Sequence, residues 1–115
     1  MGIGDRGLGM TEFAVVLTTF PADRDPAEFA RTLVEEQLAA CVNVLPPMVS
    51  TYCWKDAIET ADERQIIIKT TRARLEELRE RIDVLHPYDV PEFVVLAITE
   101  GSPAYLAWLA ENTRR

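Results

Sequence analysis

The sequence predicts an α+β domain of the ferredoxin-like type, with an antiparallel sheet, helices on one face and an extra C-terminal helix. Apolar and β-branched patterns follow the order strand, helix, strand, strand, helix, strand, helix. That order, up to the last helix, is the split βαβ arrangement, and 115 residues suit one domain. We expect residues 11–115 to form this domain. Residues 1–10 hold four of the five glycines and are predicted to be a flexible tail.

The first strand and helix are predicted from composition and from helix-start signals. Residues 13–19, FAVVLTT, are rich in β-branched side chains, which is typical of a buried strand. Asp25 is expected to cap a helix whose first residue is Pro26, because proline is favoured at that position. The helix is expected to continue to about residue 40, since apolar residues recur at helical spacing at Phe29, Leu33, Val34 and Leu38.

A long hairpin follows. Its first strand is predicted over residues 41–54, and its second ends in QIIIKT at residues 65–70. The adjacent Pro46 and Pro47 remove two donors from the hydrogen-bond ladder, so we expect a bulge or a sheet edge there. A polar turn around residues 55–57 joins the two strands.

The second half repeats the helix-strand order. Thr71 is expected to cap a helix with an apolar stripe at Leu75, Leu78, Ile82 and Leu85. The segment HPYDVPE, residues 86–92, leads into a strand over residues 93–99. Residues 101–103, Gly-Ser-Pro, are predicted to stop that strand and to open a short final helix.

The composition of the chain argues against two functional classes, nucleic-acid-binding proteins and membrane-spanning proteins. A net charge of −7 with no basic stripe argues against nucleic-acid binding. No apolar run approaches the roughly 20 residues that cross a bilayer, so no membrane span is expected. Cys41 and Cys53 lie on one β-rich stretch, too far apart for a disulfide. These thiols and the absence of an export signal predict a cytoplasmic protein.

The segment at residues 86–92 contains the only histidine of the chain. Pro87 and Pro91 keep the residues before them out of the helical conformation, so the segment is expected to be stiff, extended and accessible to solvent. We therefore expect His86 at the mouth of a cleft. A connecting role, without any ligand, is the plain alternative.

Five stretches together resemble the CutA divalent-cation tolerance proteins. They are LAACVNVLP (38–46), STYCWKDAIE (50–59), IIIKTT (66–71), LHPYDVPE (85–92) and GSPAYLAWL (101–109). The resemblance implies a PII-like variant of the ferredoxin-like fold, a tight homotrimer and a cytoplasmic role in tolerance of copper and other divalent metals. Two positions depart from the family pattern, since Asp56 stands where the family usually has glycine and Asp89 where it has glutamate.

Copper and zinc favour imidazole and thiolate ligands, so His86 and Cys41 are the first candidates. Asp89 and Glu59 are added as carboxylate ligands because the topology places them at the same end of the sheet as His86. We expect Cu²⁺ to be favoured, with Zn²⁺ possible. Cys41 is also consistent with a purely structural role, as a small apolar side chain packed inside the protein. The topology separates it from His86 by roughly 15–20 Å within one subunit. The two would therefore meet only across subunits.

The same topology predicts a cleft that an adjacent subunit closes. Its expected lining is His86, Tyr88, Asp89, Glu92, Asp23, Asp25, Trp54 and Glu59. Tyr52 and Trp54 are predicted to be interface residues, since exposed aromatic side chains at a hairpin are typical interface anchors rather than ligand stackers. Tyr88 is assigned to the interface with them.

Three functions compete at this stage. A trimeric metal-responsive binding protein is favoured by the resemblance and by the acidic surroundings of His86. A PII-like regulatory module that binds a small anion or nucleotide between subunits is the alternative, although the folded body has no glycine-rich phosphate loop. An enzyme is not expected, because no nucleophile, base and orienting group share a recognisable spacing.

Overall fold

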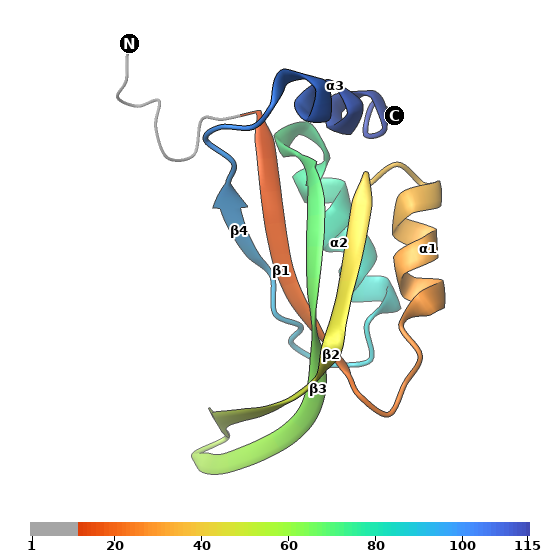
Figure 1. The fold of residues 1–115 in the computed structure, drawn as a ribbon. Coiled ribbons are helices and arrows are strands. Elements are labelled where there is room, and N and C mark those ends of the chain that lie inside the picture. Colours follow the sequence, from red (N-terminus) through yellow and green to blue (C-terminus); the bar gives the residue numbers. More distant parts are fainter. Residues whose placement is uncertain (1–11) are drawn as a thin grey trace.

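The computed structural model describes residues 12–115 and shows one antiparallel sheet of four strands in the order β2-β3-β1-β4 (Figure 1). This order confirms the predicted ferredoxin-like fold. The predicted tail, residues 1–10, lies outside the described residues. The strands are β1 (Phe13–Pro21), β2 (Cys41–Trp54), β3 (Ala57–Thr71) and β4 (Val94–Ala97).

Two helices, α1 and α2, pack on the same face of the sheet, and α3 lies at the end where β1 begins (Figure 1). The helices are α1 (Ala27–Glu35), α2 (Leu75–Leu85) and α3 (Pro103–Glu111), with a 3₁₀ turn, η2 (Arg72–Arg74), before α2. Ser102 caps α3, because its hydroxyl accepts a hydrogen bond from the Tyr105 amide at 3.3 Å. Within the described residues, no helix is long and apolar enough to cross a membrane.

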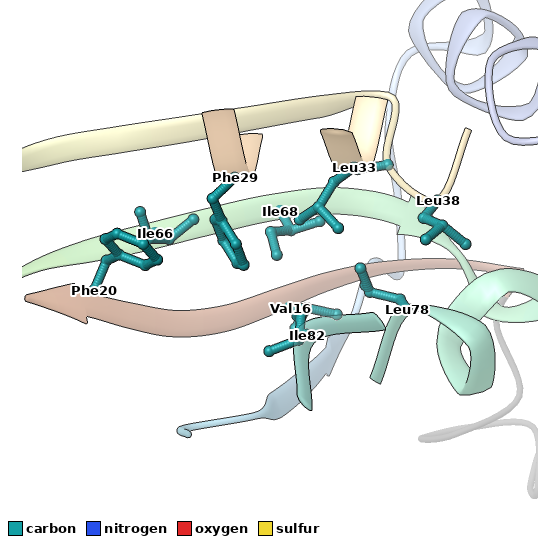
Figure 2. Close-up of a cluster of buried hydrophobic side chains, with 10 residues drawn as sticks. Val16, Phe20, Phe29, Leu33, Leu38, Ile66, Ile68, Leu78 and Ile82 are labelled. Atoms are coloured by element: carbon teal, nitrogen blue, oxygen red, sulfur yellow. The ribbon is translucent and has the colours of Figure 1, made fainter. Parts of the chain in front are cut away.

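The core lies between the sheet and the first two helices. Alternate residues of the central strands point toward the helices, as the two-residue period of a strand requires. Their side chains meet apolar residues from both helices (Figure 2). Burying each side chain of this size contributes about 1.5–3 kcal/mol to folding. The labelled members are Val16, Phe20, Phe29, Leu33, Leu38, Ile66, Ile68, Leu78 and Ile82.

The opposite side of the sheet, here called the open face, is also apolar. It is built by the residues that alternate with the core positions. Strand pairing places Val94, Leu17 and Ile67 in one row and Leu96 beside Val15 in the next. Val94 and Leu96 are 45% and 48% exposed, and the other three are half-buried. This much apolar surface on one side of a sheet is typical of an interaction face.

The predicted bulge occurs at the proline pair. Val44 pairs with Ile66, whereas Pro47 pairs with Arg64, so β2 contains one residue more than β3 across this interval. The guanidinium of Arg64 donates to the Leu45 carbonyl at 3.2 Å, which satisfies a backbone acceptor inside the bulge. After the bulge, the even-numbered residues of β2 share the open face.

A two-residue turn closes the hairpin where the polar turn was predicted. Lys55 and Asp56 both have a left-handed backbone, with φ values of 51° and 66°. Two consecutive residues of this kind match the right-handed twist of the strands that they join. Asp56 therefore adopts the conformation that favours glycine, at a modest energetic cost.

Three local expectations are wrong. Helix α1 starts at Ala27 rather than Pro26, although the Asp25 carboxylate does accept a hydrogen bond from the Ala27 amide at 2.9 Å. The helix ends at Glu35 rather than near residue 40, because Gln37 takes a left-handed backbone with φ 58°. Thr71 makes no capping hydrogen bond, since its hydroxyl donates to Thr113 in the segment after α3.

Arg74 supports the end of α1 instead, which gives a first testable prediction. Its buried guanidinium donates to the carbonyls of Glu36 and Gln37 at 3.3 and 3.1 Å. Arg74→Ala leaves both acceptors without this donor, so we expect the free energy of unfolding to fall by about 2–3 kcal/mol. Chemical denaturation measures this, with the exposed Arg72→Ala as the control. An equal loss in both variants would contradict the role of Arg74.

Candidate functional site

The segment at residues 86–92, here called the arm, folds back onto the sheet and buries its histidine. His86 has an extended backbone, as expected, with φ −83° and ψ 140°. The residue is only 7% exposed, and its ring lies edge-on to Phe20 and Phe29, at centroid distances of 5.3 and 6.0 Å. The expectation of a solvent-accessible His86 at the mouth of a cleft is therefore wrong.

Both ring nitrogens of His86 are engaged. The amide of Tyr88 donates to Nδ1 at 3.1 Å, so Nδ1 is the acceptor nitrogen. The proton therefore resides on Nε2, which donates to the Thr19 carbonyl at 2.5 Å. Burial lowers the pKa of His86, against smaller opposing effects from the Thr19 hydrogen bond and the charge of Glu63. A neutral imidazole in this position holds the arm against β1 and leaves no nitrogen free for a metal.

Next to the arm, a cavity of about 760 Å³ lies on the open face at its hairpin end. It is lined by strand residues from the hairpin on one side and by the arm on the other. We call it the acidic cavity, because four carboxylates and no lysine or arginine are found among its described lining residues. These residues are Thr19, Met48, Ser50, Thr51, Tyr52, Trp54, Glu59, Glu63, Gln65, Pro87, Tyr88, Asp89, Val90, Pro91 and Glu92.

Two of the four carboxylates are held by neutral partners. Glu63 is 8% exposed and accepts a hydrogen bond from the Tyr88 hydroxyl at 3.1 Å. Burial, followed by the Glu63 hydrogen bond and charge, raises the pKa of Tyr88 to about 12, so the phenol stays protonated. The Glu92 carboxylate accepts a hydrogen bond from the side-chain amide of Gln65 at 3.1 Å. Among residues 12–115 none of the four acids forms an ion pair.

Most of the predicted cleft is present. The structure brings together Tyr88, Asp89, Glu92, Trp54 and Glu59, and adds the predicted interface residue Tyr52. His86, Asp23 and Asp25 do not line the cavity, since the first is buried beneath the arm and the other two are exposed outside it.

Sequence reasoning missed Glu63 and Gln65. Their signal was the two-residue period of β3, which places Glu59, Glu63 and Gln65 on the same side of the strand as Ile67. Moving back along β3 from Ile67 in steps of two residues reaches Gln65, then Glu63 and, two steps further, Glu59.

Cys41 lies at the other end of the sheet, as expected. It pairs with Lys69, and its thiol is 3.8 Å from the Asn43 side-chain oxygen. His86 contacts Thr19, which pairs with Gln65, four residues from Lys69 along β3. Four residues of strand span about 13 Å, so one chain does not bring the two residues together. The part of the chain that the structure describes contains no group of three or more His, Cys, Asp or Glu side chains placed to hold a metal ion.

The fold and the site define a small ferredoxin-like α+β protein with an acidic cavity beside an exposed apolar sheet face. The chain belongs to the CutA1 divalent ion tolerance protein family, whose family model matches residues 14–112. The resemblance found in the sequence is therefore confirmed.

Three relatives illustrate the similarity. The divalent-cation tolerance protein CutA of Thermus thermophilus is 46% identical over 99 residues, which cover 86% of this chain and 96% of that protein. The chloroplastic protein CutA of Arabidopsis thaliana is 43% identical over 87% of this chain, which spans about half (55%) of the plant protein. A solved structure of the divalent cation tolerance protein from T. thermophilus has a TM-score of 0.84 at 46% identity, covering 88% of this chain and 98% of that one.

Proposed function

We propose that this protein is a homotrimer that binds divalent metal ions in the acidic cavity, with Cu²⁺ favoured and Zn²⁺ second. The observation that carries the proposal is the set of four carboxylates that line one cavity without a lysine or arginine among the described lining residues. Such a cavity attracts cations. The names of the relatives, which refer to divalent-cation tolerance, agree with this chemistry.

Glu59 and Asp89 are the proposed ligands. Both are exposed, and they reach the cavity from the hairpin and from the arm. For a given set of oxygen and nitrogen donors, Cu²⁺ binds more tightly than the other divalent first-row metals, which favours copper over zinc. Two carboxylates do not fill a coordination shell, so water or a neighbouring subunit supplies the remaining donors. The assignment of Cys41 and His86 as further ligands stays a prediction, and the occupied ring nitrogens of His86 oppose it.

The open face supports the trimer. Its apolar rows run from Leu17 and Ile67 to the edge strand β4, where Val94 and Leu96 are almost half exposed. Neighbouring copies that cover these rows remove the apolar surface and the exposed sheet edge from water. The acidic cavity continues the same face, so the partner approaches its rim, where Tyr52 and Trp54 are 41% and 39% exposed. We assign Tyr52, Trp54 and Tyr88 to this contact.

An anionic ligand, the PII-like alternative, is less well supported. A phosphate or nucleotide requires basic side chains or free backbone amides. The described lining of the acidic cavity offers no lysine or arginine for this purpose. The cytoplasmic location and the absence of an enzymatic activity stay predictions.

Calorimetric titration with Cu²⁺ and Zn²⁺ tests the proposed metal site. We expect the double variant Glu59→Gln with Asp89→Asn to bind Cu²⁺ at least about tenfold more weakly, since it removes both free carboxylates. The matched control, Glu28→Gln with Glu76→Gln, removes two exposed acids on the helices, outside the cavity, and should bind like the parent. Equal Cu²⁺ affinity in the parent and the cavity variant would refute the proposal.

A further inference from the structure

We propose that, in the homotrimer, Lys69 of each copy enters the acidic cavity of the next copy and forms an ion pair there with Glu63. This inference rests on the trimer proposed above, and it names a residue that the neighbouring copy contributes to the cavity. It leaves Glu59 and Asp89 available as the proposed metal ligands.

Lys69 is the only lysine or arginine on the strands of the open face within the described residues. It pairs with Val15 of β1 and Cys41 of β2, so it lies at the end of the face opposite the acidic cavity. The residue is half-buried, and among residues 12–115 it forms no ion pair. A neighbouring copy that covers the open face removes its ammonium group from water. That step is costly unless the neighbour supplies a carboxylate.

Glu63 has the opposite requirement. It is more than nine-tenths buried, lines the acidic cavity and accepts a hydrogen bond from the neutral phenol of Tyr88. A carboxylate has about four acceptor sites, and no other donor from the described part of the chain bonds to this one. A buried carboxylate is normally paired with a cation. Its surroundings therefore point to a cation that comes from outside the chain.

The two groups do not meet within one copy. They lie six residues apart on β3, and a strand of that length spans about 20 Å. A ring of three copies closes through a heterologous contact, in which one region of each copy meets a different region of the next. In such a ring the basic end of each open face meets the acidic end of the next face, so three ion pairs form. The apolar rows around Ile67 lie between these ends and are covered by the same contact.

Lys55 is the other cation near the cavity. It is exposed in the turn of the hairpin, and its side-chain nitrogen lies 5.8 Å from the centroid of its own Trp54 ring. An ion pair between exposed groups contributes little to binding. Lys69 instead lies on the surface that assembly buries, where an unpaired charge is costly. Lys69 is therefore the occupant that the charges favour.

A double-mutant cycle on the full chain tests the pair. Light scattering over a dilution series measures trimer dissociation, in urea sufficient to bring the parent into its dissociation range. Lys69→Met keeps an apolar stem and removes the charge, and Glu63→Gln keeps an acceptor for the Tyr88 hydroxyl. We expect each single variant to raise the apparent dissociation constant at least about tenfold. The double variant should dissociate no more readily than the less stable single variant, because it leaves no charge of the pair buried alone.

The matched control is the cycle of Lys69→Met with Glu59→Gln, which removes another acid of the cavity. Its two effects should add, since Glu59 is not the proposed partner. Additive effects in the Lys69–Glu63 cycle, or a Lys69→Met trimer as tight as the parent, overturn the inference and leave the trimer standing. Equal coupling of Lys69 to both acids overturns it too, because that result indicates general charge attraction. A parent protein that is itself monomeric refutes the proposed trimer.

Discussion

Replacing Ile67 with glutamate is expected to convert the proposed trimer into monomers. Ile67 is half-buried at the centre of the open face, between Leu17 on β1 and Asn43 on β2. If the open face is covered by other copies, each subunit of the variant buries an unpaired carboxylate there. An uncompensated buried charge costs about 3–5 kcal/mol, and a trimer contains three copies of it. Light scattering on the variant should therefore give the mass of one chain, 13.0 kDa.

The control places the same charge away from the open face. Val84 is 73% exposed on α2, so Val84→Glu changes the net charge equally without touching the sheet. We expect this control to remain trimeric. A trimeric Ile67→Glu protein, or a parent protein that is itself monomeric at micromolar concentration, would show that the open face is not the interface.

Replacing His86 with alanine is expected to lower the free energy of unfolding by about 2–4 kcal/mol. The ring packs against Phe20 and Phe29 and bonds both the arm and β1, so its loss leaves a cavity and an unsatisfied carbonyl at Thr19. Urea denaturation measures the loss. Val84→Ala, on an exposed side chain, is the control and should change stability by less than about 0.5 kcal/mol.

The same histidine predicts how stability depends on pH. The folded protein lowers the pKa of His86, so the unfolded chain binds a proton near pH 6.5 that the folded chain does not bind until a lower pH. Stability is therefore fully present above about pH 6.5 and falls as the pH drops toward the folded pKa. Since His86 is the only histidine, His86→Gln should remove this dependence. An unchanged slope between pH 5.5 and 7 in that variant would contradict the assignment.

Much of the fold was predictable because its signals are local. The β-branched content of FAVVLTT, the proline pair of β2 and the Ser102-Pro103 helix start each depend on a few neighbouring residues. The order of the elements then determined the topology. Within the site, Glu59 and Asp89 were placed correctly at one end of the sheet for the same reason.

The state of His86 was not predictable from such signals. Its burial depends on two phenylalanines more than 50 residues earlier in the chain and on a carbonyl of β1. The prolines around it indicated an extended backbone correctly, but they carry no information about the surface that an extended segment covers. The same holds for Glu63, whose phenol partner comes from the arm.

The bulge at Pro46-Pro47 sets which side of the hairpin faces the acidic cavity. Its single extra residue shifts the alternation of β2, so that Tyr52 and Trp54 lie on the cavity side while Val49 and Cys53 lie on the reverse. The length of β2 is therefore subject to a parity rule. Adding or deleting two residues beyond the bulge preserves the side on which each remaining aromatic ring lies. A change of one residue would exchange the two sides, so that evolution or design can lengthen this hairpin only in steps of two without dismantling the cavity.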